Sequence, residues 1–237
     1  MDLGIDGKVA LVTAASKGLG RAAALALSRE GARLVICARG ADRLAATAAE
    51  LPGEVLAIPA DVTEGHVPAE LAAEAIERFG ALDILVANAG GPPPARALDA
   101  TDEGLLDAVN ANLLTSIRLV RASLPHMRNA GWGRICLITS YSVKQPIPTL
   151  AYSNTARTGL WGWAKTAAQD LVEDGITLNL ACPGPHATDR MKELGTGGRM
   201  GDPEDFGRVV AFLCSEPAGF VSGAALQVDG AGTLGLL

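Results

Sequence analysis

The stretch Lys8–Gly20, KVALVTAASKGLG, decides the fold of this chain. Val9–Val12 is a short, unbroken apolar run, which is typical of a strand buried on both faces of a parallel sheet. A turn of small residues follows, and Arg21–Arg29 then has the pattern of a helix with Ala and Leu on its inner side. Such a turn offers free backbone N–H groups and a positive helix end to an anion. Taken alone, the turn is equally consistent with a purely structural role.

The rest of the chain alternates strand-like and helical segments with short joints, without an internal repeat or a linker. We therefore expect one domain over residues 1–237, an α/β Rossmann fold with a doubly wound, parallel, seven-stranded sheet and helices on both faces. The further strands are expected at 33–37, 54–58, 82–86, 134–138, 176–180 and 225–228. The further helices are expected at 41–50, 67–79, 103–128, 149–170 and 203–213.

Composition excludes several classes of function. The net charge of −6 argues against a nucleic-acid partner, because neutralising phosphates requires clustered Lys and Arg. The longest apolar runs are too short to span a membrane, and Met1–Gly4 does not resemble a secretion signal, so we expect a cytoplasmic protein. The four cysteines are far apart in the sequence and no Cys-x-x-Cys occurs, which predicts buried free thiols and no metal site. They are Cys37, Cys136, Cys182 and Cys214.

The first turn resembles the Thr-Gly-x-x-x-Gly-x-Gly turn of the short-chain dehydrogenase/reductase family. Gly18 and Gly20 match its last two glycines, and Ala14 stands where the family usually has the first. The resemblance implies that the turn binds the pyrophosphate of a nicotinamide cofactor through Thr13, Ala15, Ser16, Lys17, Gly18, Leu19 and Gly20.

The end of the second predicted strand bears on the choice of cofactor. An acidic residue there would hydrogen-bond the adenosine ribose, whereas a basic residue accommodates a 2′-phosphate. This chain has Ala38 and Arg39 at that point, and Lys17 in the first turn could reach the same phosphate. Both cations favour NADP(H); the alternative is that they are two solvated surface charges.

Further matches to the family follow the predicted strands in order. Asp61 and Val62 follow the third strand and resemble its adenine contact. Asn88, Ala89 and Gly90 follow the fourth strand and match its Asn-Ala-Gly motif, which lies against the cofactor. The loop after the sixth strand resembles the segment that holds the nicotinamide, through Pro183, Gly184, His186 and Thr188.

The implied catalytic residues agree with the family only in part. Asn112 matches the asparagine of a long connecting helix, and Ser140 matches the serine that binds substrate. The family also uses a tyrosine about thirteen residues after that serine and a lysine four residues further on. These positions hold Ser153 and Arg157. Moving the frame back by one recovers Tyr152 but turns the side chain by about 100° on a helix, so the resemblance implies an atypical site.

A serine hydroxyl is a much weaker acid than a phenol, and an arginine, with a pKa above ~12, does not pass protons on. Arg157 can still donate to ribose hydroxyls. Candidate replacement acids are Tyr141, Tyr152 and His186, of which only histidine titrates near neutrality. The alternatives are that the tyrosines line a pocket or a subunit contact and that His186 is exposed to water. The family's substrate lid corresponds to Asp189–Arg199, which is short and rich in glycine.

The resemblance implies an NADP(H)-dependent oxidoreductase that interconverts a carbonyl and an alcohol on a small organic substrate, similar to β-ketoacyl-carrier-protein-reductase-like members. The alternatives are a cofactor-binding or scaffold protein without turnover and a non-redox enzyme on the same fold. We also expect a homodimer or homotetramer, because Gly159–Ala164 places two tryptophans on an outer helix and Leu234–Leu237 is an apolar tail.

Overall fold

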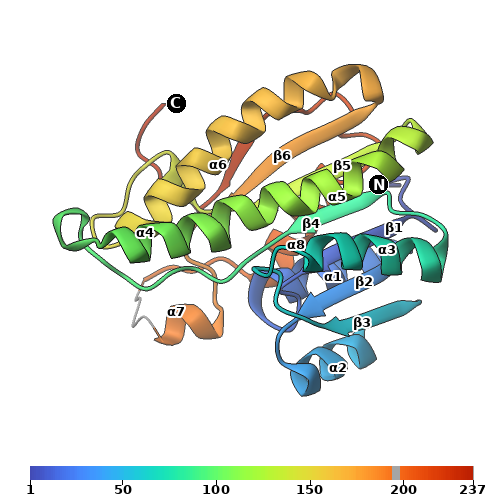
Figure 1. Ribbon diagram of the computed structural model, residues 1–237, viewed down its shortest axis with the longest axis horizontal. Coiled ribbons are helices and arrows are strands. Elements are labelled where there is room, and N and C mark those ends of the chain that lie inside the picture. The colour runs from blue at the N-terminus through green and yellow to red at the C-terminus, as the bar shows by residue number, and fades with distance from the viewer. Residues whose placement is uncertain (194–197, 237) are drawn as a thin grey trace.

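The computed structural model describes residues 1–193 and 198–236. Its centre is one sheet of seven parallel strands in the spatial order β3-β2-β1-β4-β5-β6-β7, which confirms the predicted doubly wound fold (Figure 1). The strands are β1 (Val9–Thr13), β2 (Arg33–Ala38), β3 (Val55–Pro59), β4 (Ile84–Ala87), β5 (Gly133–Ile138), β6 (Ile176–Pro183) and β7 (Ala225–Val228).

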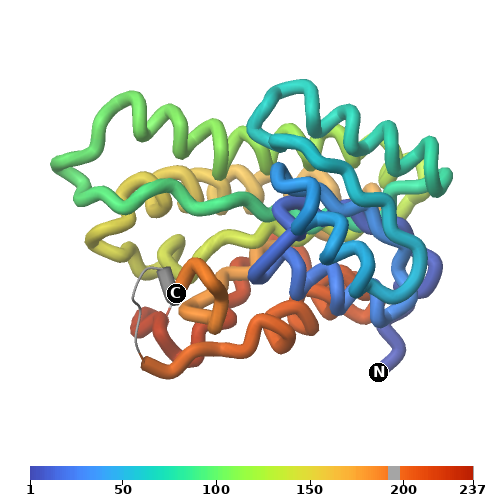
Figure 2. Tube along the Cα trace, turned by 90° about the horizontal axis from the view of Figure 1, so that it is seen from below, coloured from blue at the N-terminus to red at the C-terminus, as the bar shows by residue number. Residues whose placement is uncertain are grey.

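Two layers of helices cover the sheet. Apolar residues of α3, α5 and α6 pack on one face and those of α1, α2 and α8 on the other, an arrangement that Figure 2 shows from below. The bounds are α1 (Gly18–Arg29), α2 (Ala41–Glu50), α3 (Val67–Phe79), α4 (Asp102–Val109), α5 (Thr115–Ala130), α6 (Ala151–Asp170), α7 (Asp189–Glu193) and α8 (Pro203–Leu213). The expected helices 41–50, 67–79 and 203–213 agree with these bounds.

Alternation along the strands divides the core between the two layers. In β1, Val9 and Leu11 pack under the α3–α5–α6 layer, whereas Ala10 and Val12 pack under the α1–α2–α8 layer. A parallel strand buried on both faces needs apolar residues at every position, and all five residues of β1 are buried. All four cysteines are buried free thiols, as predicted.

The helix expected at 103–128 is interrupted. Between α4 and α5 the chain forms one π-helical turn, η2 (Asn110–Leu114). The Thr115 hydroxyl donates a 2.8 Å hydrogen bond to the backbone oxygen of Asn110, and Arg118 donates a 2.7 Å bond to the Asn110 side-chain oxygen. The two side chains thus provide hydrogen bonds to both oxygens of Asn110, where the regular helical pattern is displaced. Such π-helical turns are frequent at functional sites.

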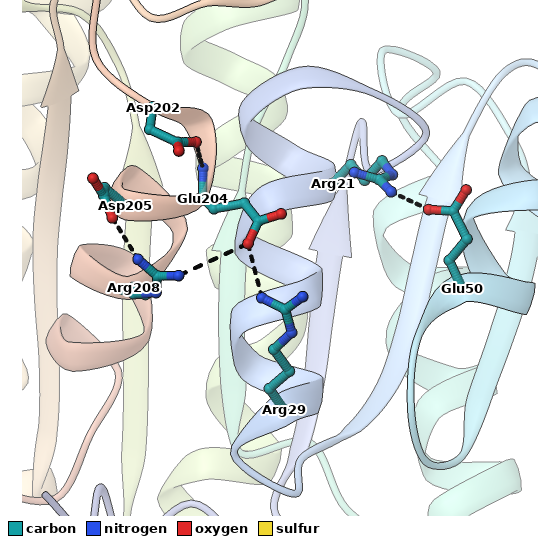
Figure 3. Close-up of polar contacts among 7 residues, drawn as sticks. All are labelled: Arg21, Arg29, Glu50, Asp202, Glu204, Asp205 and Arg208. Carbon is teal, nitrogen blue, oxygen red and sulfur yellow. Dashed lines mark hydrogen bonds and ion pairs between the residues drawn. The ribbon is translucent and has the colours of Figure 1, made fainter.

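Helices α1 and α8 lie against each other closely. A side chain at Gly207 in α8 would overlap the backbone of Ala22 in α1, so glycine is required there. Figure 3 shows the polar edge of this contact. The Glu204 carboxylate forms ion pairs with the guanidinium of Arg29 at 2.9 Å and with that of Arg208 at 3.8 Å. These ion pairs are largely exposed and each contributes about 0–1 kcal/mol, so the close backbone approach holds the helices together.

The strand order runs in opposite directions on the two sides of the β1–β4 pair. Ligands of open α/β sheets bind at such a switch point, beyond the carboxyl ends of the strands. Every helix in the described part of the chain is too short or too polar to cross a membrane. The two tryptophans of α6, Trp161 and Trp163, are half-buried against the core, and the oligomer expected from them stays a prediction.

Candidate active site

A cleft of about 790 Å³ lies beyond the carboxyl ends of β1 to β4. Its volume is within the range of about 300–1,000 Å³ that is usual for cofactor and small-molecule sites. The predicted cofactor-binding residues that line it come from four different loops, and the predicted catalytic residue Asn112 comes from η2. These cofactor-binding residues are Ser16, Lys17, Arg39, Asp61, Val62, Ala89 and Gly90. The fold therefore brings together residues that are almost one hundred positions apart in the sequence.

The first turn takes its shape from three small residues. Ala14 has a φ of +48°, a left-handed conformation that favours glycine, so alanine is strained where the family usually has its first glycine. Gly18 has a φ of +58° and lies beside Thr188 of the loop after β6. A Cβ at Gly20 would lie 2.7 Å from Asn88 Nδ2 and would overlap the Ala14 carbonyl. Because these three residues are small, their side chains do not cover the backbone N–H groups at the start of α1.

Thr13 holds two of the cleft loops together. Its hydroxyl donates a 2.7 Å hydrogen bond to the Asn88 backbone oxygen and accepts a 2.9 Å bond from the Asn88 backbone N–H. Because Thr13 is completely buried, this hydroxyl fixes the loop after β4 against the end of β1. Ala15 is also buried, and its N–H donates a 3.0 Å bond to the Cys37 oxygen at the end of β2.

The β2 end of the cleft carries exposed positive charge. The Arg39 side chain is 82% exposed, and its guanidinium lies 3.9 Å from the Asp61 carboxylate. The backbone N–H of Thr63, the Thr63 hydroxyl and Arg39 together hold the pKa of Asp61 below its usual value. Asp61 is thus ionised at neutral pH, while Arg39 keeps donors that face the solvent.

Asn112 is buried in the wall of the cleft without a hydrogen-bond partner. The residue is 3% exposed, and neither its side-chain oxygen nor its nitrogen has a partner in the described part of the chain. Leaving a buried amide unsatisfied costs about 1–3 kcal/mol. A buried amide without a partner calls for another polar group, for example an ordered water or a ligand atom.

Ser140 and the backbone oxygens that Arg157 binds lie at the end of β5. The Ser140 hydroxyl accepts a 3.1 Å hydrogen bond from the Ser142 N–H at the start of the short helix η3 (Tyr141–Val143). Arg157 Nη1 donates to the backbone oxygens of Ile138 at 3.2 Å and Thr139 at 2.9 Å. Ser153 lies one turn earlier on the same side of α6 and is 7% exposed.

Arg157 is a buried cation. Burial, reinforced by the nearby guanidinium of Arg190, lowers the pKa of Arg157 to about 10. The group is still positively charged at neutral pH. Its two described bonds go to neutral carbonyl groups and use one of its nitrogens, so the guanidinium keeps further N–H donors for a ligand.

The three candidate replacement acids have different surroundings. Tyr152 is buried against α4. Its hydroxyl accepts a 3.0 Å hydrogen bond from the Thr101 N–H and so lies at the start of α4. His186 is 4% exposed, so the expectation that it faces water is wrong. Its ring packs edge-on against Phe206 of α8, with ring centres 5.2 Å apart, and Nδ1 lies 2.9 Å from the Gly184 oxygen. Tyr141 is half-buried beside Ser140.

The loop after β6 is fixed to its neighbours. Gly184 donates a 3.0 Å backbone bond to Val228 of β7, and a Cβ at Gly184 would press on Asp229 at 2.7 Å. Pro183, at the end of β6, is paired in register with Val228. Of the expected lid Asp189–Arg199, residues 189–193 form α7, and 194–197 lie outside the described residues.

Sequence reasoning missed one wall of the cleft. The residues that form it lie on α4 and η2, upstream of Asn112 and one or two turns apart. They are Gly104, Asp107, Ala108 and Ala111. The small residues at 104, 108 and 111 recur at helical spacing and could have indicated a wall that a ligand approaches closely. Asp42 and Arg43, after Arg39, also line the cleft and were missed.

Comparisons with known proteins agree with this architecture. Residues 13–233 match the family described as enoyl-(acyl carrier protein) reductase. The chain is 34% identical to L-rhamnose 1-dehydrogenase (NAD(P)(+)) of Azotobacter vinelandii, over 94% of this chain and 95% of that protein. It is 32% identical to the 3-oxoacyl-[acyl-carrier-protein] reductase of Haemophilus influenzae, over 95% of this chain and 98% of that protein. The crystal structure of L-sorbose reductase from Gluconobacter frateurii complexed with NADPH and L-sorbose superposes with a TM-score of 0.90, at 31% identity, covering 97% of this chain and 98% of that one.

Proposed function

Because the chain belongs to the short-chain dehydrogenase/reductase family, we propose that it is an NADP(H)-dependent oxidoreductase with a non-standard active site, which interconverts a carbonyl and an alcohol on a small organic substrate. The observation that carries this proposal is the 790 Å³ cleft at the switch point of the sheet, with Lys17 and Arg39 in its wall. The L-sorbose reductase that resembles this chain was crystallised with NADPH, which supports the same cofactor here.

The residues present fit such a cofactor. The first turn leaves no side chain at Gly20, so main-chain N–H groups are accessible to a pyrophosphate. Arg39 and Lys17 are exposed cations at the place expected for a 2′-phosphate. Asn112 is among the residues that line the cleft, and its buried amide has no partner in the described part of the chain. When bound, the nicotinamide would supply or accept the hydride.

The chain's own residues would orient the substrate. Ser140 has one hydroxyl hydrogen to donate, because its described bond uses it as an acceptor. That hydrogen can stabilise negative charge that develops on a substrate oxygen. Arg157, anchored to Thr139, holds positive charge beside this serine. Ser153 occupies the family's tyrosine position and is too weak an acid for the usual proton transfer, so we place the proton donor on another group or a bound water.

The test is a turnover screen of ketones and alcohols with NADPH and NADP⁺, followed through the absorbance of the nicotinamide. We expect oxidation of NADPH with at least one class of carbonyl compound. Tight NADPH binding without turnover on any substrate would contradict the proposal and favour the second candidate, a cofactor-binding protein that acts as a sensor or scaffold. The observation that favours this second candidate is the burial of Arg157 against backbone oxygens in place of the family's lysine.

A further inference from the structure

The side-chain amide of Gln145 holds a distant segment of the chain in place. Its Nε2 donates a 3.3 Å hydrogen bond to the backbone oxygen of Gly232, and its Oε1 accepts a 2.7 Å bond from the backbone N–H of Leu234. These two residues follow Gln145 by 87 and 89 positions. We call residues 229–234, which come directly after β7, the post-β7 segment. One amide, with a donor and an acceptor, thus binds both kinds of backbone group in this segment.

Gln145 lies one tight turn after the candidate substrate serine. The backbone N–H of Val143 donates a 3.2 Å hydrogen bond to the oxygen of Ser140, and the N–H of Gln145 donates a 3.2 Å bond to the oxygen of Tyr141. These bonds close the short helix η3 and the residues that follow it. The position of the Gln145 backbone is therefore fixed relative to Ser140.

The loop that carries Gln145 is also held from its other end. Asn154 Nδ2 donates a 2.9 Å hydrogen bond to the backbone oxygen of Ile147, and Asn154 Oδ1 accepts a 3.4 Å bond from the Ile147 N–H. Asn154 directly follows Ser153 on α6. Because both ends of this loop are bound, the Gln145 amide is a fixed attachment point for the post-β7 segment.

The post-β7 segment contacts the loop after β6 as well. A Cβ at Gly184 would lie 2.7 Å from the Cα of Asp229. The Asp229 carboxylate closes the segment into a turn, because it accepts a 2.8 Å bond from the Thr233 N–H and a 2.6 Å bond from the Thr233 hydroxyl. Since β5, β6 and β7 are parallel neighbours, their carboxyl ends lie at one edge of the sheet. The segment thus connects the Ser140 turn with the loop that the family resemblance assigns to the nicotinamide.

We infer that Gln145 is a positioning residue for the substrate: by holding the post-β7 segment near Ser140, it makes this segment one wall of the space that receives the carbonyl compound. The inference rests on the proposed function and adds a residue that determines substrate affinity. A wall that is ordered before the substrate arrives lowers the entropic cost of binding. The main effect is therefore on KM. The cofactor cleft lies beyond β1 to β4, so NADPH binding depends little on Gln145.

The first test replaces Gln145 by methionine, which has a similar length and lacks the amide. On the best ketone of the turnover screen, Gln145→Met should raise KM at least about tenfold and change kcat and the Kd of NADPH less than about threefold. Gln145→Glu keeps an acceptor for the Leu234 N–H and should raise KM less. The control Gln169→Met, at an exposed position near the end of α6, should leave KM unchanged.

Hydrogen exchange tests the link to the post-β7 segment directly. The backbone amide of Leu234 should exchange faster in Gln145→Met than in the unmodified protein or in Gln169→Met. A second variant loosens the segment without touching Gln145: Thr233→Val removes the hydroxyl bond to Asp229 and should raise KM in the same direction. Faster exchange with unchanged KM would overturn the inference, because the segment would then lie outside the substrate space. Unchanged exchange in Gln145→Met would overturn it too, because other contacts would then hold the segment.

A binding measurement separates this inference from the proposed function. The NADP⁺ complex cannot reduce a ketone, so a rise in its melting temperature on addition of each ketone of the screen reports binding alone. The rise should be smaller in Gln145→Met than in the unmodified protein. If no compound is turned over, the proposed function fails, while this difference still supports the positioning role. An equal rise in both proteins would overturn the inference, and so would the absence of any rise.

Discussion

Arg157 donates a 2.9 Å hydrogen bond to the backbone oxygen of Thr139, the residue directly before Ser140. The resemblance to the family implies that Arg157 binds the cofactor ribose. The structure shows that the same side chain also binds the end of β5. The bond connects α6 to the strand that carries the substrate serine. Cofactor binding and local stability are therefore expected to depend on the same residue.

Replacing Arg157 by methionine should affect both properties. Loss of the donor leaves the Ile138 and Thr139 oxygens unsatisfied, which should lower the free energy of unfolding by about 1–3 kcal/mol. NADPH binding should weaken by ~1.5–3 kcal/mol, the value of a charge-assisted hydrogen bond. Arg157→Lys should lower the free energy of unfolding and the NADPH affinity by smaller amounts. Urea unfolding and a fluorescence titration with NADPH measure the two effects, and unchanged NADPH affinity in the methionine variant would refute the ribose role.

The basic residue after β2 predicts a preference between the two nicotinamide cofactors. NADP(H) should bind at least about tenfold more tightly than NAD(H), the ~1.4 kcal/mol of one good phosphate contact. Arg39→Ala should remove most of this difference, because Arg39 is an exposed cation at the cleft. Titration of the apo protein with both cofactors measures it. Arg29→Ala on the far side of α1 serves as the control, and equal affinities in the unmodified protein would disprove the assignment.

The first turn should not tolerate a side chain at Gly20. In Gly20→Ala the new methyl group would overlap the Ala14 carbonyl and press on Asn88. Such overpacking should lower the free energy of unfolding by about 1–3 kcal/mol and should weaken cofactor binding. Gly40→Ala is the matched control, because Gly40 also lines the cleft and a Cβ there meets nothing within 4 Å. Thermal unfolding with and without NADPH compares them; equal behaviour of the two variants would contradict the close approach.

The two serines should differ in their effect on turnover. Ser140→Ala should reduce kcat by ~10²-fold or more, as expected for the loss of a donor to a developing oxyanion. Ser153→Ala should lower kcat only slightly and leave NADPH binding unchanged. Steady-state kinetics on the best substrate of the screen measures both. If Ser153→Ala abolishes turnover while binding persists, this hydroxyl is catalytic and our account of the site is wrong.

The double change Ser153→Tyr with Arg157→Lys rebuilds the family's pair of residues and tests the same account from the opposite direction. If reduction of generic ketones appears only in this variant, the native chain has abandoned the usual reaction. If the unmodified protein already reduces them, its own residues are sufficient. The unfolding measurement of the single Arg157→Lys variant controls for loss of the bond to Thr139.

We predict that the protein is a dimer or a tetramer. Leu106 in α4 is 70% exposed and Leu114 in η2 is 37% exposed, which leaves apolar surface along the helical segment before α5. Light scattering should give two or four times the chain mass of 24.2 kDa at micromolar concentration. Leu106→Asp should shift the population toward the monomer, whereas Arg96→Asp should not. A monomer in the unmodified protein would refute the prediction.

The sequence by itself determined the parallel sheet, its helices and the cleft edge. Unbroken apolar runs such as Val9–Val12 are typical of strands covered on both faces, and small residues after the first strand allow a phosphate to approach the main chain. The resemblance to the family also places Ser153 and Arg157 where the family uses tyrosine and lysine, and the atypical site that this implies stays a proposal. Local pattern is sufficient for these features because each depends on neighbours within a few residues.

Only the tertiary structure decided which side chains face one another. Burial of His186 depends on Phe206 twenty residues later, and the orphaned amide of Asn112 depends on the π-helical turn between α4 and α5. The contact of Arg190 with Pro92 joins segments 98 residues apart. Such contacts arise when distant elements pack against each other. They produce no local pattern in the sequence, so they could not be predicted from it.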